Sequence, residues 1–222
     1  MDITSAVLLK GAWYALEQCG NLLRDALLLY RARAYSSAVA LAMIGREELG
    51  KHRMLLEEWR KSQETGKLPS LEAIQTACAD HIDKQRRAVL GLTFIGEGGS
   101  ALDAAIRTQM KHKPQDKEYL EAEKVIQAAL KSVAKRAPDD RHAARMHALY
   151  VDLKDSGADW NRPLDITQDE SKKLVGDAAN DYAGQWDRLN PDRVRAMGDL
   201  RLAEALEAWK ERPALPEPVW PE

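Results

Sequence analysis

The sequence predicts an all-α fold, a helical bundle built on two long antiparallel helices near the N-terminus with further helices after them. Apolar residues recur at helical spacing along most of the 222 residues, and no alternating apolar and polar run typical of a strand exceeds a few residues. Glycine and proline cluster between the periodic segments, where they end helices. The clearest apolar series consists of Leu9, Trp13, Leu16, Gly20, Leu23, Leu27 and Tyr30.

The two N-terminal helices are predicted from this series and a second one. A short break at Arg33-Ala34 separates the first helix from a stripe formed by Leu41, Ile44, Leu55 and Trp59, which ends before Thr65-Gly66 and Pro69. Two long helices joined by so short a connection must pack antiparallel.

Local signals place the helices that follow. Ser70 is the expected N-cap of a third helix that runs to the glycines at 96, 98 and 99. After Pro114 we expect a helix over 117–136, and Pro138 is expected to start a shorter segment that ends near Leu153. The segment 155–163, which carries Trp160, is predicted to be an ordered loop.

The C-terminal part contains two more predicted helices and a proline-rich tail. Thr167 and Glu170 form a capping box for a helix to about residue 188, and Asn190-Pro191 starts a last helix to about residue 209. Four prolines in the tail favour an extended polyproline II strap with Trp220 as an anchor, and the alternative is a disordered end. We therefore expect one domain over 1–210 and a tail over 211–222.

Composition narrows the class of function. Hydrophobic residues make up 45% and charged residues 31% of the chain, and the net charge is −2. A general nucleic-acid-binding protein usually has a basic excess, so only a local RNA site fits. Cys19 and Cys78 lack the spacing of a zinc site and are expected to be reduced. With no signal peptide and no apolar run long enough for a bilayer, we expect a cytoplasmic protein that binds no membrane.

Several polar residues fall where the core is expected. Helical projection places Glu48 and His52 near the middle of the second stripe, with Glu47 and Lys51 paired on its flank. His81 falls on the apolar face of the third helix. The prediction is a buried cluster of Glu48, His52 and His81, with Lys51 and Lys84 at its rim. Such a cluster is either a structural network or a catalytic or ligand-binding site; a metal site is the weaker alternative, because no second Glu/His pair occurs.

Several short segments occur in an informative order along the chain: residues 13–17, 22–26, 35–42, 45–51 (Gly-Arg-Glu-Glu-Leu-Gly-Lys), 80–84 (Asp-His-Ile-Asp-Lys) and 149–152 (Leu-Tyr-Val-Asp), followed by Trp160 and Pro163. This order resembles that of the AbiV family of bacterial abortive-infection proteins, which belongs to the HEPN superfamily. The resemblance implies a homodimer that acts in phage defence. It also implies either a ribonuclease that arrests host translation, with RNA as substrate and no cofactor, or a non-catalytic protein that blocks translation or another host process after binding a phage-encoded activator.

HEPN ribonucleases typically carry an Arg followed four to six residues later by a His, and three stretches resemble that pattern. Arg46 projects about 120° away from His52 on a continuous helix, and the stretch from Arg107 to His112 is more typical of a solvated surface. The third stretch starts at Arg141, has a polar residue directly after it and lies near a predicted helix start. Its members are Arg141, His142 and His147, with Tyr150 and Asp152 as secondary candidates.

In the mechanism that this resemblance implies, His147 is a general acid or base and Arg141 stabilises the charged phosphorane, without a metal. The alternative is that Arg141, His142 and His147 are ordinary residues of a solvated helix.

Overall fold

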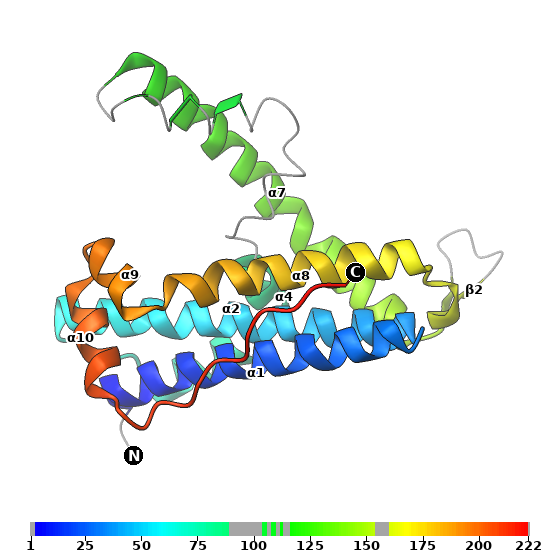
Figure 1. Cartoon of the computed structure of the whole chain (residues 1–222), viewed down its shortest axis with the longest axis horizontal. Coiled ribbons are helices and arrows are strands. Elements are labelled where there is room, and N and C mark those ends of the chain that lie inside the picture. The colour runs from blue at the N-terminus through cyan, green and yellow to red at the C-terminus, as the bar shows by residue number, and fades with distance from the viewer. Residues whose placement is uncertain are drawn as a thin grey trace.

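The computed structural model describes residues 3–88, 104–105, 108–109, 112, 116–153 and 160–221, which are almost entirely helical (Figure 1). The predicted all-α fold is confirmed. Within the described ranges, strand structure is limited to one hairpin of two-residue strands, and a 3-10 turn, η1 (Pro163–Asp165), follows it. In chain order, the other described elements are α1 (Ser5–Arg31), α2 (Tyr35–Thr65), α3 (Leu71–Ala79), α4 (His81–Ala88), α7 (Lys117–Leu149), β1 (Asp152–Leu153), β2 (Trp160–Asn161), α8 (Gln168–Arg188), α9 (Pro191–Ala196) and α10 (Leu200–Ala208).

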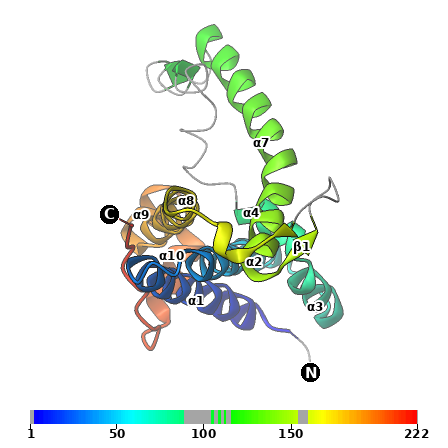
Figure 2. The same ribbon diagram turned by 90° about the vertical axis from the view of Figure 1, so that its right-hand side faces the viewer.

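Helix α2 is the centre of the bundle. It runs antiparallel to α1 and also packs against α4, α7 and α8, so that helices cover it on several sides. The view along the bundle shows α1, α2 and α8 side by side, and α7 rising away from these three helices (Figure 2). No described helix combines the length and the apolar character that a membrane span requires.

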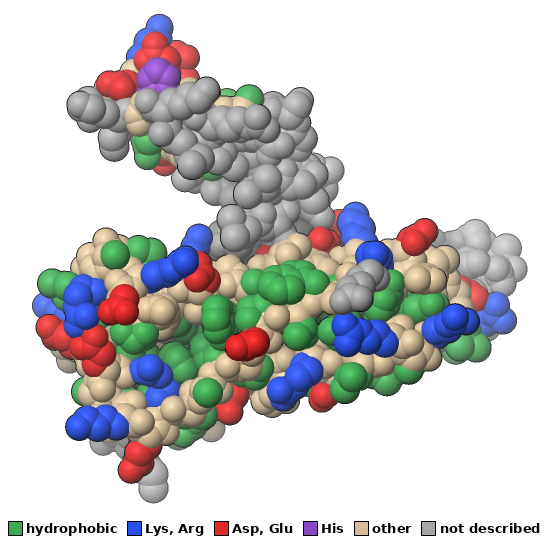
Figure 3. Space-filling view, viewed as in Figure 1, with side chains coloured by type: hydrophobic (Ala, Val, Ile, Leu, Met, Phe, Trp, Pro, Cys, Tyr) green, Lys and Arg blue, Asp and Glu red, His purple; other side chains and the backbone are tan. Residues whose placement is uncertain are grey.

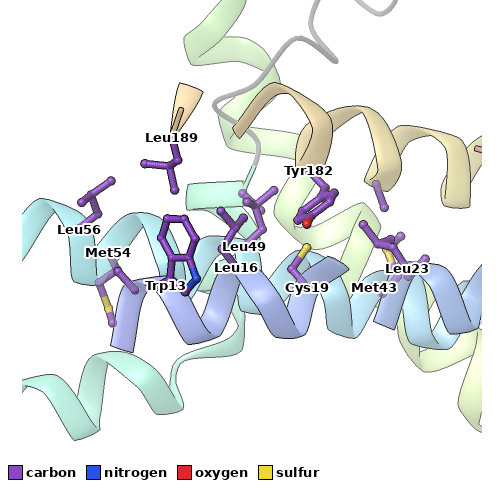
Figure 4. Packing of buried hydrophobic residues seen from close by; sticks show 14 of the residues in the cluster. Trp13, Leu16, Cys19, Leu23, Met43, Leu49, Met54, Leu56, Tyr182 and Leu189 are labelled. Atoms are coloured by element: carbon purple, nitrogen blue, oxygen red, sulfur yellow. The ribbon is translucent and has the colours of Figure 1, made fainter. Parts of the chain in front are cut away.

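The core lies between α1, α2 and α8 (Figure 4). Leu16 and Cys19 of α1, Met43 and Leu49 of α2, and Tyr182 of α8 have 1% exposure or less. Complete burial raises the pKa of the Cys19 thiol, which is therefore protonated and unreactive. Cys78 on α3 is partly buried, and both cysteines are free.

Most local signals act as predicted. Arg33, at a φ of 62°, makes the turn between α1 and α2, and Gly66, at a φ of 68°, ends α2. The Ser70 hydroxyl accepts a hydrogen bond from the backbone N–H of Ala73 at 3.1 Å and caps α3. Thr167 forms the predicted capping box at the start of α8.

The predicted third helix is broken at Asp80. This residue has an extended backbone (ψ of 101°), and its side chain accepts a hydrogen bond from the N–H of Asp83, so that it caps a new helix, α4. This local hydrogen bond competes with the apolar pattern that predicted a continuous helix, because an Asp side chain can accept a hydrogen bond from a backbone N–H two or three residues later. The rest of the predicted segment, from Val89 to the glycine cluster, lies outside the described residues.

Two further boundaries differ from the prediction. Helix α7 continues through Pro138 to Leu149, because its C-terminal part packs against α2 and α4 and this packing overrides the local helix-ending signal. The predicted last helix is split into α9 and α10, because Gly198 adopts a φ of 86° and Asp199 caps a new helix.

Candidate functional site

Glu47 of α2 is the centre of a polar cluster between α2, α4 and α7. Its side chain is 5% exposed. His81 Nδ1, on α4, donates a hydrogen bond to Oε2 at 2.6 Å, and the Arg145 guanidinium, on α7, donates to Oε1 at 2.6 Å. Lys84 and Gln85 of α4 complete the group. We call these five residues the Glu47 cluster.

The charges of the cluster do not cancel. Lys84 Nζ lies 3.8 Å from Glu47 Oε2, so one carboxylate faces two permanent cations, those of Lys84 and Arg145. Gln85 donates to the carbonyl of Met43 at 3.0 Å and anchors α4 on α2. A partly open site with excess positive charge suits an anionic ligand such as a phosphate group. Over the described ranges, no three or more His, Cys, Asp or Glu side chains are gathered as a metal site requires.

His81 is the exposed member of the cluster. Its side chain is 51% exposed, whereas those of Glu47 and Lys84 are buried. A carboxylate only accepts hydrogen bonds, so Nδ1 carries the proton, and in the neutral ring Nε2 then carries a lone pair. The described residues give Nε2 no hydrogen-bond partner. Glu47 thus orients an imidazole whose free nitrogen can accept a proton from a bound molecule.

Two residues of α2 hold α4 in place. A Cβ atom at Gly50 would overlap the backbone carbonyl of Lys84, so glycine is required for the close approach of the two helices. One turn further along, Arg53 donates to the carbonyls of Arg87 at 2.8 Å and Ala88 at 3.0 Å, at the end of α4. Gly50 and Arg53 together fix the position of His81 relative to Glu47.

Gly50→Ala is expected to displace α4. The added methyl group meets backbone, which cannot rotate away, so we expect a loss of about 1–3 kcal/mol in the free energy of unfolding. Urea denaturation followed by circular dichroism measures this loss. Gly11→Ala is the matched control, because its Cβ would meet only the flexible end of the Leu55 side chain, at 3.2 Å. Equal effects of the two substitutions would contradict the proposed role of Gly50.

The predicted composition of the cluster is wrong in three respects. Glu47, not Glu48, lies at its centre, and Lys51 pairs with Glu48 at 2.6 Å instead of with Glu47. His52 is 1% exposed and donates from Nδ1 to the carbonyl of Ala12 on α1 at 2.8 Å, away from His81. The prediction fails because it assumed that α2 buries a single face. Other helices cover α2 on several sides, so residues beside that face are buried as deeply as residues on it.

His52 makes stability depend on pH. Burial is the main cause that lowers the pKa of its imidazole from 6.5 to about 4. Between these values the unfolded chain binds a proton that the folded chain does not, so stability is complete above pH 6.5 and falls as the pH falls toward 4. Between pH 7 and pH 5 the expected loss is about 2 kcal/mol.

Urea denaturation at a series of pH values tests this. His52→Gln keeps an amide donor for the Ala12 carbonyl but does not titrate, so its stability should vary less over the same range. An unchanged slope in that variant would assign the pH dependence to other groups.

Arg141 and His147 do not meet within one chain. Both lie on the continuous helix α7, away from its start, and six residues along a helix place them about 120° apart. Arg141 is 6% exposed, and His142 and His147 are partly buried. Convergence of Arg141 and His147 therefore requires a second copy of the chain. Instead, Arg145 of the same segment faces the site.

The remaining candidates lie outside the cluster. Tyr150 directly follows α7 and is 53% exposed. Asp152 pairs with Asn161 in the short hairpin, and its side chain lies outside the described part of the structure. His112 is exposed, and its Nδ1 lies 3.8 Å from Asp116 Oδ2. Arg107 lies outside the described residues.

Comparison with known families decides the relationship. The family model HEPN_AbiV, described as AbiV, matches residues 7–183. The chain belongs to the AbiV family. Membership in this HEPN family indicates a role in abortive infection, that is, in defence against phage. The matched range includes the Glu47 cluster, whereas α9, α10 and the tail follow it. No curated protein and no solved structure shows a significant match.

Sequence reasoning missed one buried ion pair next to this site. Arg46 of α2 donates two hydrogen bonds to Asp181 of α8, at 3.0 and 2.5 Å, and the two side chains are 1% and 0% exposed. A signal was present, because Asp181 interrupts the apolar face that Ala178 and Tyr182 form on α8. For Arg145 the sequence contains no comparable signal.

Proposed function

We propose that this AbiV protein cleaves RNA during phage infection and that the Glu47 cluster is its cleavage site. The observation that carries the proposal is the 2.6 Å hydrogen bond from Nδ1 of the half-exposed His81 to Oε2 of the buried Glu47, whose other oxygen accepts a hydrogen bond from the Arg145 guanidinium at 2.6 Å. A carboxylate, an oriented imidazole and two cations are the groups that phosphodiester cleavage by RNA's own 2′-hydroxyl requires.

The geometry supports the following reaction. His81 Nε2 takes the proton of a 2′-hydroxyl, and that oxygen attacks the adjacent phosphorus. The bond from phosphorus to the 5′-oxygen breaks, and the leaving oxygen takes a proton from solvent. Glu47 stabilises the imidazolium through Nδ1, while Lys84 and Arg145 stabilise the negative charge that develops on the phosphoryl oxygens. The products are a 2′,3′-cyclic phosphate and a 5′-hydroxyl end.

His81→Asn tests the proposal. Asparagine keeps a donor near the position of Nδ1 for Glu47 but removes Nε2, so we expect cleavage to fall about 10²- to 10⁴-fold while the fold is kept. Purified protein is incubated in EDTA with total RNA from phage-infected bacteria, and 5′-hydroxyl ends are mapped. His147→Asn is the matched control, and circular dichroism verifies folding of both variants.

The control also separates this site from the Arg141/His147 motif. Loss of cleavage in His147→Asn but not in His81→Asn would overturn the proposed site and favour that motif. If cleavage persists in both variants, neither imidazole is the general base.

A second candidate function is non-catalytic. In it the chain inhibits translation or another host process after binding a phage component, and the Glu47 cluster joins α2, α4 and α7 structurally. The divergence of Arg141 and His147 on α7 favours it. Plaque counts on cells that produce the His81→Asn variant distinguish the two functions, because a binding protein retains phage resistance without Nε2 whereas a ribonuclease loses it.

A further inference from the structure

The C-terminal tail, residues 211–221, follows a three-residue pattern of exposure. Every third residue is exposed, and the residues between are partly buried. A polyproline II helix has three residues per turn, so one of its edges faces solvent and two face the protein. The exposed edge consists of Glu211, Ala214, Glu217 and Trp220. The tail crosses α1 toward α8 as an extended segment (Figure 1).

Two aromatic donors recognise the backbone of this tail. The Trp13 indole N–H, on α1, donates to the carbonyl of Pro213 at 2.9 Å, and the Tyr182 hydroxyl, on α8, donates to the carbonyl of Pro216 at 2.6 Å. The two carbonyls are three residues apart, which is one turn, so they lie on the same edge. Aromatic side chains that bind a proline-rich backbone are the hallmark of polyproline II recognition.

The surface of α1 and α8 beneath the tail is complementary to it. Any Cβ at Gly20 would overlap the Tyr182 hydroxyl and lie 3.0 Å from the Pro216 Cβ, so glycine makes room for both. Leu215 and Val219 pack against the hydrophobic core. At the start of the tail, the Arg212 guanidinium lies 4.7 Å from the centre of the Trp13 ring.

The tail leaves part of the surface beside it uncovered. Two hollows, of about 430 and 790 Å³, border it on the side of α8 and α9, and Trp186 lines both. Ala214 borders the smaller hollow, and Trp220 borders the larger one together with the exposed Met197. Apolar side chains gather along the middle of the face that the tail crosses (Figure 3). A segment with larger side chains at these positions would bury more apolar surface than the tail does.

We propose that α1 and α8 form a binding groove for polyproline II segments, and that a proline-rich segment of another polypeptide binds there in place of the tail. The ligand presents two carbonyls, three residues apart, to Trp13 and Tyr182, and a bulky side chain to the hollow at Trp186. The tail competes at the effective concentration of a tethered ligand, of the order of millimolar. The incoming segment outcompetes it because the hollows give it additional apolar contact.

The experiment measures binding of a fluorescent peptide of residues 210–221 to the full chain by anisotropy. In one variant, Leu215→Asp/Val219→Asp, the tail loses its apolar contacts while the groove is unchanged. In a second, Gly176→Cys/Pro221→Cys, a disulfide holds the tail in place, because a Cβ at Gly176 would lie 3.7 Å from the Pro221 Cγ. Circular dichroism verifies that both variants fold.

We expect the released variant to bind the peptide at least about tenfold more tightly than the wild type, and the oxidised disulfide variant not to bind it until it is reduced. Adding Tyr182→Phe to the released variant should weaken binding about fivefold, the loss of one hydrogen bond. A peptide carrying Ala214→Trp should bind more tightly, because the indole enters the smaller hollow. No binding to the folded released variant, or equal binding of a proline-free scrambled peptide, would overturn the proposal.

Discussion

Asp181→Ala is expected to lower the free energy of unfolding by about 3–5 kcal/mol, because it leaves the guanidinium of Arg46 buried without its carboxylate. Both side chains are excluded from water, at 1% and 0% exposure, so solvent cannot replace the lost partner. The pair also joins α2 to α8, and its loss loosens the contact that positions Tyr182 under the tail. Urea denaturation at pH 7 measures the effect.

The double variant Arg46→Met/Asp181→Leu is the control for this prediction. Removing both charges removes the desolvation cost along with the attraction, so the double variant should be more stable than Asp181→Ala. If the double variant is as unstable as the single one, the loss reflects packing of the two side chains rather than their charges.

Glu47→Ala should have an effect of similar size, about 3–5 kcal/mol. Without the carboxylate, the ammonium of Lys84 and the guanidinium of Arg145 face each other in a largely buried space with no opposite charge between them. α4 and α7 would then separate from α2, and the proposed RNA cleavage would be lost with them.

Glu48→Ala is the matched control for Glu47→Ala. Glu48 is the next residue of α2, and its pair with Lys51 is part-exposed, at 19% and 26%, so the expected loss is below about 1 kcal/mol. Denaturant titrations of the two alanine variants make the comparison. Equal losses would show that the buried ion pairs of Glu47 contribute no more to the free energy of unfolding than the part-exposed pair of Glu48 with Lys51.

The sequence predicts those parts of the fold that depend on local chemistry. The ends of α1 and α2 are marked by Arg33 and Gly66, and the starts of α3 and α8 by Ser70 and Thr167, because turns and caps are interactions over a few residues. The break at Asp80, which the sequence pattern did not predict, also depends on a local interaction. It shows that an Asp within an apolar helical pattern can be the N-cap of a new helix.

The candidate site depends on contacts between distant segments, and there local reasoning is insufficient. His81 and Lys84 were identified from the apolar face of a helix, but the choice between Glu47 and Glu48 depends on where α4 and α7 pack around α2. Arg145 reaches Glu47 across 98 residues of sequence, and the direction of its side chain follows from the rotation of α7, which no local pattern determines.

The three-residue pattern of the tail has a consequence for how its length can change. Inserting one residue between Pro213 and Pro216 would advance every later residue by a third of a turn, which turns Glu217 from solvent into the groove and moves the Pro216 carbonyl away from Tyr182. Inserting three residues restores the phase. The exposure pattern of the tail is therefore preserved only by length changes of whole turns, much as a strand keeps its faces only when its register shifts by two.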